Sequence, residues 1–142
     1  MYDSAARIMN GTHGQVWEDG DLIAECTAFQ VKAAKTFEDK TRAGLMATDR
    51  KLVSVKITGS MTLDKVYTRH ADDTDAAMAG HDIRHTLVGA LADPDAYGTE
   101  RIAVYGVSFD DQTLADWAAA KGGTVTIPFT ATDYKYLDKV EA

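Results

Sequence analysis

Histidines and aspartates gather in one segment of the chain at spacings that could hold a metal ion. His81 and His85 are four residues apart, the separation that places two imidazoles on one face of a helix. Three aspartates lie nearby, namely Asp72, Asp73 and Asp82. His85 nevertheless enters a strand-like run, where residues four apart are about 13 Å from each other. The glutamate that follows the first histidine in the zinc-protease motif is also missing. Surface histidines at a helix-to-strand junction are therefore the favoured interpretation, and no metal site is predicted.

The other reactive residues do not form a catalytic set. Asp110 and Asp111 are adjacent acids, but a helix cap ahead of Trp117 explains them without catalysis. Asn10-Gly11-Thr12 fits a glycosylation sequon, yet without a secretory signal the Asn-Gly pair is better explained as a tight turn. The sequence contains neither GxxxxGK nor GxSxG. Because no nucleophile, base and orienting residue occur together, we expect no enzyme, no catalytic residue and no cofactor.

Length and composition indicate one globular domain spanning residues 1–142. Hydrophobic residues make up 45% and charged residues 26%, as in ordinary globular proteins. The single cysteine, Cys26, excludes a disulfide framework and a cysteine-based zinc site. A net charge of −7 is the wrong balance for gripping nucleic acid. No apolar run approaches the roughly 20 residues of a membrane span, so we expect folding in a cytoplasm and no membrane binding by the subunit.

Strand patterns dominate the chain. From Leu52 the sequence LVSVKITGSMTLDKV alternates apolar and polar residues, and TVTIPFTATDY does the same near the C-terminus. The segment around Phe29 and Phe37 alternates as well. Period-two alternation predicts strands with one buried face and one wet face. On the first of these strands the predicted buried face comprises Val53, Val55, Ile57, Met61 and Leu63.

The remaining elements are predicted from composition and from the residues that form turns and end helices. The runs DIRHTLVGAL and RIAVYGVSF are apolar on both faces and predict covered strands. A helix is predicted over residues 111–121, with Leu114 and Trp117 on one face and Gly122 as its stop. Residues 71–80 fit either a helical turn or a loop. A polar lead-in covers residues 7–15, a tight turn is expected at 18–21, and a charged loop at 38–51 separates two long strands.

The sequence resembles phage tail tube proteins, in particular the short tube proteins of contractile-tailed phages and of prophage-like tailocins from Gram-positive bacteria. The resemblance covers nearly the whole chain. It is carried by RIMNGTHGQVWEDGDLIAE near the start, KAAKTFEDKT and VKITGSMTLDKVYTR in the middle, and LADPDAYGTERIAVYGVSFDD with TLADW toward the end. The N-terminal lead-in is its most specific part.

The resemblance implies a mainly β fold: a small β-sandwich or β-barrel-like tail tube domain with one flanking short α-helix and a long loop between two long strands. It implies a structural virion protein whose hexameric rings stack into an inner tube inside a contractile sheath. The implied partners are further copies of the chain and the tail sheath, baseplate and tape-measure proteins. DNA would be non-specific passing cargo, or the tube would puncture a membrane. The implied location is a virion tail or tailocin particle, assembled in the bacterial host cytoplasm.

Two groups of residues are the candidates for these roles. The wet faces of the long strands would line the channel, and they comprise Gln30, Lys32, Ala34, Thr36, Ser54, Lys56, Thr58, Ser60 and Thr62. The lead-in and the long loop would make contacts between rings, through Asn10, Gly11, Thr12, His13, Gly14, Arg42, Gly44, Leu45 and Met46.

Two other functions fit part of the pattern. A type VI-like secretion-system tube protein would have a related fold, although the NGTHGQ lead-in favours the phage-type family. A small monomeric β-barrel that binds a ligand or metal would place the histidine cluster near its mouth. The monomeric alternative predicts a protein that stays single at high concentration.

Overall fold

A computed structural model describes residues 3–142, so residues 1–2 of the predicted domain lie outside the described part. Within residues 3–142, eight strands, one α-helix and two 3₁₀ turns follow each other. The strands are β1 (Gly14–Glu18), β2 (Asp21–Leu22), β3 (Cys26–Lys40), β4 (Asp49–Asp64), β5 (His85–Leu91), β6 (Glu100–Phe109), β7 (Thr124–Ala131) and β8 (Asp133–Asp138). The helix is α1 (Ala71–Met78), and the 3₁₀ turns are Ala5–Arg7 and Gly11–His13. The predicted mainly β fold class is confirmed.

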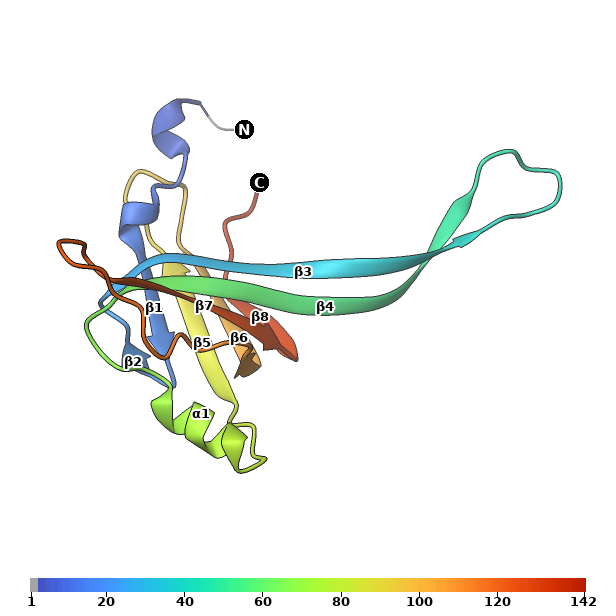
Figure 1. Ribbon diagram of the computed structural model, residues 1–142. Helices are drawn as coiled ribbons and strands as arrows, with labels where there is room; N and C mark the ends of the chain where they lie inside the picture. The colour runs from blue at the N-terminus through green and yellow to red at the C-terminus, as the bar shows by residue number, and fades with distance from the viewer. Residues whose placement is uncertain (1–2) are drawn as a thin grey trace.

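All eight strands join one antiparallel sheet that folds over on itself at β6. The strand order is β2-β1-β5-β6-β7-β4-β3, and β8 also pairs with β6. Residues 101–105 of β6 pair with β8, whereas residues 108–109 pair with β7. Between them Gly106 has a φ of +62°, which a residue with a side chain rarely adopts, and a Cβ there would overlap the side chain of Thr132. This kink carries β7, β4 and β3 across the layer formed by β1, β5 and β6 (Figure 1).

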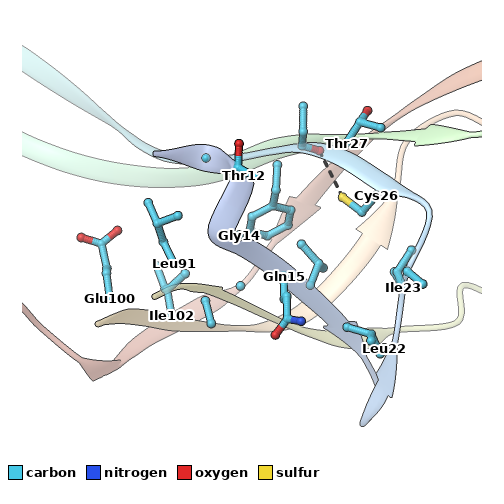
Figure 2. Close-up of a pocket in the computed structure, with 17 residues that line it drawn as sticks. Thr12, Gly14, Gln15, Leu22, Ile23, Cys26, Thr27, Leu91, Glu100 and Ile102 are labelled. Atoms are coloured by element: carbon cyan, nitrogen blue, oxygen red, sulfur yellow. Dashed lines mark hydrogen bonds between the residues drawn. The ribbon is translucent and has the colours of Figure 1, made fainter. Parts of the chain in front are cut away.

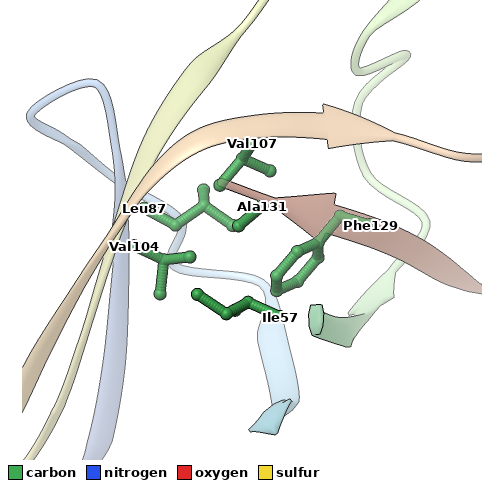
Figure 3. Packing of buried hydrophobic residues seen from close by; sticks show 6 residues of the cluster. All are labelled: Ile57, Leu87, Val104, Val107, Phe129 and Ala131. Carbon is green, nitrogen blue, oxygen red and sulfur yellow. The ribbon is translucent and has the colours of Figure 1, made fainter. Parts of the chain in front are cut away.

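The core fills the space between these two layers. One cluster of buried side chains consists of Ile57, Leu87, Val104, Val107, Phe129 and Ala131 (Figure 3). A second consists of Val16, Ile23, Met61, Leu63 and Ile127. Phe29 packs against both clusters and covers Gly89, where an added Cβ would stand 2.7 Å from its ring. On β4, therefore, the core begins at Ile57 and continues toward the C-terminal end of the strand.

The long strands β3 and β4 extend far beyond this core as a two-stranded projection (Figure 1). They have 15 and 16 residues, but only residues 57–64 of β4 also pair with β7. We call residues 34–56 the arm and residues 41–48 the arm tip. Every residue of the arm is exposed apart from Phe37, which is half-buried under the guanidinium of Arg50 at 3.6 Å from its ring centroid. The arm therefore packs against no other element of the described part of its own chain.

Several sequence predictions can be compared with these elements. The tight turn is confirmed, because Asp19 and Gly20 connect β1 to β2 with positive φ angles. The predicted loop 38–51 is too long, since residues 38–40 and 49–51 pair with each other and leave only the arm tip unpaired. Residues 71–78 form the helix α1. Among residues 3–142, no helix is long and apolar enough to cross a membrane.

The predicted helix at 111–121 is wrong, because this segment is irregular. The apolar side chains of the expected helix are not buried against the fold: Leu114 is 77% exposed and Trp117 is 85% exposed. A helix of this length is marginal in water unless tertiary packing buries one face. Asp110 does not cap a helix either. Its backbone N–H donates to the carbonyl of Pro128, and its carboxylate accepts a hydrogen bond from Thr130 Oγ1 at 3.1 Å.

Candidate assembly and channel-lining surfaces

The nine predicted lining residues share one face of the β3–β4 ladder. Pairing in an antiparallel ladder places directly opposed residues on the same face. The observed pairs are Gln30 with Ser60, Lys32 with Thr58, Ala34 with Lys56, and Thr36 with Ser54, while Thr62 pairs with Ala28. The structure therefore brings all nine residues together, and we call this set the polar face.

Strand β7 widens the polar face by a third strand. Thr126 lies opposite Thr62 with their hydroxyl oxygens 3.4 Å apart, and Thr130 lies opposite Thr58. Pro128 stands between them, next to the point where pairing of β7 with β6 ends. The threonine alternation in TVTIPFTATDY indicated a wet face, but the order of strands in the sheet could not be read from it.

The opposite face of β4 carries apolar side chains from Val53 to Leu63 but is covered only in part. Ile57, Met61 and Leu63 are buried, as predicted. Val53 and Val55 are 54% and 49% exposed, so their predicted burial is wrong for the isolated chain. Alternation identifies which face is apolar, whereas burial depends on whether a second layer reaches that far. The arm thus carries an uncovered continuation of the core face.

The loop residues chosen as stacking candidates lie at the arm tip. Gly44 has a φ of +85° and forms a turn in which Leu45 N–H donates to the carbonyl of Arg42. Leu45 is half-exposed and Met46 is fully exposed. Arg42 is also exposed. The arm tip consequently presents apolar side chains and a cation to whatever lies beyond the chain.

The lead-in is fixed to the body of its own chain. Asn10 N–H donates to the carboxylate of Asp93 at 2.8 Å, and the Asn10 side chain accepts from Thr12 N–H at 3.1 Å. Asp93 is buried, and hydrogen bonds from the backbone N–H groups of Asp95 and Asn10 lower its pKa below the usual 3.8. The outer surface of residues 10–14 remains exposed, including His13. Within one chain the lead-in lies on the body, whereas the arm tip lies far out from it (Figure 1).

An open groove runs beside the lead-in. It has a volume of about 690 Å³ and lies between β1, β5 and the beginning of β3 (Figure 2). Gly11, Thr12 and Gly14 contribute to its wall, and much of the rest is apolar. Cys26 lines it, with its thiol donating to the carbonyl of Ala28 at 3.4 Å, and burial raises the pKa of this thiol. The groove holds no arrangement of nucleophile, base and orienting residue.

The histidine-rich segment forms a network of ion pairs that ties α1 to the turn between β1 and β2. His85 Nδ1 lies 2.6 Å from Asp19 Oδ2, and its Nε2 bonds the carboxylate of Asp73 in α1. His70 stacks on Phe109 at 4.0 Å between ring centroids. The predicted surface position of His85 is therefore wrong, although His81 is exposed. Across residues 3–142, no group of three or more His, Cys, Asp or Glu is arranged to hold a metal ion.

The electrostatics of this network follow from bonds at both ring nitrogens of His85. A neutral imidazole donates from one nitrogen, whereas the imidazolium ion donates from both. Burial opposes the charged form, but the hydrogen bonds to Asp19 and Asp73 outweigh it and raise the pKa of His85 above 6.5. Burial likewise acts against ionised Asp19, but the hydrogen bonds from His85 and Thr86 N–H lower its pKa below 3.8. His70 Nε2 adds a contact of 2.6 Å to Glu18.

Comparison with known proteins decides the family. The sequence profile of a family described as phage tail tube protein matches residues 1–138.

The chain belongs to the phage tail tube protein family.

A relative from Bacillus subtilis is similar over nearly the whole length of both chains. The phage-like element PBSX protein XkdM of Bacillus subtilis (strain 168) is 27% identical over 139 residues, covering 96% of this chain and 95% of that protein. The tail tube family is structural and has no enzymatic activity, as the absence of a catalytic set in the sequence had led us to expect.

The tail tube fold is also found in contractile injection systems. A chain of the sheath-tube complex of the extracellular contractile injection system PVC superimposes with a TM-score of 0.73 at 10% identity, covering 95% of this chain and 98% of that one. A chain of the sheath/tube terminator of the same system superimposes with a TM-score of 0.74 at 9% identity, covering 92% and 96%. The family match makes this protein a structural component of a phage-type tail tube.

The His85 network predicts a loss of stability at alkaline pH. A raised pKa in the folded state means that the contribution of His85 is complete below pH 6.5 and is lost as pH rises through the folded pKa. The lowered pKa of Asp19 means that its contribution is present above pH 3.8 and is lost as pH falls through the folded pKa. We expect the free energy of unfolding, measured by urea titration, to fall as pH rises above 6.5 through the folded pKa of His85. His85→Gln should flatten this fall, and the control His81→Gln should keep it. Equal slopes in wild type and His85→Gln would contradict the assignment.

Proposed function

We propose that this tail tube protein works as a polymer, in which hexameric rings stack into the inner tube of a contractile tail. The arm is the observation that carries the proposal. Its 23 residues, numbered 34–56, extend beyond the part of the sheet that a single chain covers with a core. An exposed long strand edge recruits other chains, and most proteins guard against this. In a tube subunit the recruitment would be the function.

Ring closure would follow from the free edge of β3. Among the described strands this one pairs with β4 alone, so one side of its 15 residues offers backbone donors and acceptors to a neighbour. A heterologous contact whose rotation closes gives a ring, and closure leaves no strand edge unpaired. Each backbone hydrogen bond contributes only about 1 kcal/mol net, but many repeat around a ring. The uncovered Val53 and Val55 would gain a packing partner in the same step.

Stacking of rings would use the arm tip and the lead-in. These two surfaces lie apart on one chain, which suits contact between successive copies along an axis. Leu45 and Met46 would bury apolar surface against the next ring. The exposed side of the lead-in, residues 10–14, would meet the ring on its other side.

The polar face would then line the channel. Hydroxyls of serine and threonine dominate it, and it carries no large apolar side chain. DNA would pass over such a wall as cargo without sequence-specific contacts, or the tube would puncture a membrane in a headless particle. The tail sheath would surround the outside of the tube, a tape-measure protein would set its length, and a baseplate would start its assembly.

Assembly should depend on the arm tip while folding should not. We expect the double variant Leu45→Ser/Met46→Ser to abolish hollow rods in negative-stain micrographs of concentrated protein. Its thermal midpoint as a subunit should stay within about 2 °C of wild type, because exposed side chains contribute little to folding. Met78 is 86% exposed at the end of α1, so Met78→Ser is the matched control and should still give rods. Rods from the arm-tip variant would contradict the stacking role, and a wild type without rods or rings would contradict the proposed function.

The lining assignment predicts a change of thiol reactivity on assembly. In a Cys26→Ser background, Thr36→Cys and Thr58→Cys should react with a bulky maleimide in the subunit and become at least about tenfold slower in tubes, because the channel restricts access. Asp75→Cys on α1 serves as the exposed control and should react alike in both states. Unchanged reactivity at Thr36→Cys and Thr58→Cys in tubes would show that the polar face points elsewhere.

A further inference from the structure

The polar face has a charge opposite to that of the whole chain. The chain contains 22 acidic and 15 basic residues, for a net charge of −7. Among the nine residues of the polar face the only charged ones are Lys32 and Lys56. The nearest acids along the strands border the face: Glu38 follows Thr36 by two residues on β3 opposite Lys51, Asp64 ends β4 opposite Thr124, and Asp110 lies against Thr130. The nine positions of the polar face therefore carry two cations and no acid, in a chain that is acidic as a whole.

The two lysines are neighbours without a counter-ion. Lys32 pairs with Thr58 and Lys56 with Ala34, which makes the lysines diagonal neighbours, about 7–8 Å apart between Cα atoms. Both side chains are exposed. Within residues 3–142 neither forms an ion pair, whereas Lys40 of the same arm pairs with Glu38 at 2.8 Å. Like charges this close repel each other, so the arrangement becomes favourable when an anion is added.

We propose that Lys32 and Lys56 make the polar face a weak binding surface for the phosphodiester backbone of a nucleic acid. The inference rests on the proposed function, because only a closed tube turns the face into a continuous wall. Repetition around a ring would give a belt of ammonium groups facing the axis. A wall of low dielectric would focus their field on the passing polyanion.

The chemistry of the face favours nucleic acid over an acidic polypeptide. Protein interfaces rely on aromatic and large apolar anchors, and the polar face has neither. Phosphate oxygens accept hydrogen bonds from lysine and from hydroxyl groups, and the polar face carries both kinds of donor. Contacts to the backbone alone carry no sequence information and let a protein slide along DNA. A channel lined in this way would hold its cargo loosely and still let it move.

Fluorescence anisotropy of a labelled oligonucleotide, titrated with assembled tubes over a series of NaCl concentrations, tests this inference. Wild-type tubes should bind with an affinity that falls steeply with salt. The double variant Lys32→Gln/Lys56→Gln should bind about tenfold more weakly at low salt and with a shallower salt slope. Lys35 pairs with Val55 on the opposite face, and Lys121 lies in the segment between β6 and β7. The matched control Lys35→Gln/Lys121→Gln changes net charge equally. It should leave binding within about twofold of wild type, because these two lysines do not belong to the polar face.

The outcomes separate the inference from the function on which it rests. Equal weakening by both double variants, or no binding by wild-type tubes, would overturn the role of the two lysines even if rods form normally. Displacement of the oligonucleotide by polyglutamate at equal charge concentration would point to a general anion surface and would also overturn it. The same titration is repeated on unassembled subunits, where it compares the two double variants directly. An absence of rods would then contradict the proposed function, while the binding difference between the variants would still test the role of the two lysines.

Discussion

The structure depends on a mismatch between strand length and core length. Strand β4 has neighbours on both sides only over residues 57–64, and among the described residues 49–56 pair with β3 alone. A two-stranded hairpin is at best marginally stable in water unless further strands or a second layer cover it. The arm nevertheless keeps the alternation of a covered sheet, with Val53 and Val55 on one face and the polar face on the other. Its sequence is therefore that of a sheet that needs a further layer or strand, which the proposed assembly would supply.

The sequence predicted much of this organisation because alternation is a local property. It placed the nine lining candidates on one face, and the register of β3 against β4 confirms their common side. It also located the turn at Asp19 and Gly20, where positive φ angles require residues that tolerate them. The family resemblance pointed to the tube fold, which the comparisons confirm. The polar face as a surface could thus be derived before any coordinates, although its place in a channel stays a prediction.

The errors arose where structure depends on distant contacts. The segment with Leu114 and Trp117 has the spacing of an amphipathic helix, but no layer of the fold reaches its apolar side. His85 looked like a surface residue because its two carboxylate partners, Asp19 and Asp73, are 66 and 12 positions away in the chain. Burial of Val53 and Val55 was misjudged for the same reason, since alternation does not indicate where a second layer ends.

Amide hydrogen exchange along β3, compared between free subunits and assembled tubes, tests the central claim most directly. If sister copies complete the arm, the outward-facing amides of residues 34–40 should exchange rapidly in the subunit and at least about tenfold more slowly in the tube. The amides of buried β6 should be protected in both states and serve as the internal reference. Equal exchange of the β3 amides in both states would mean that no neighbouring strand pairs with this edge, and the account of the arm would be wrong.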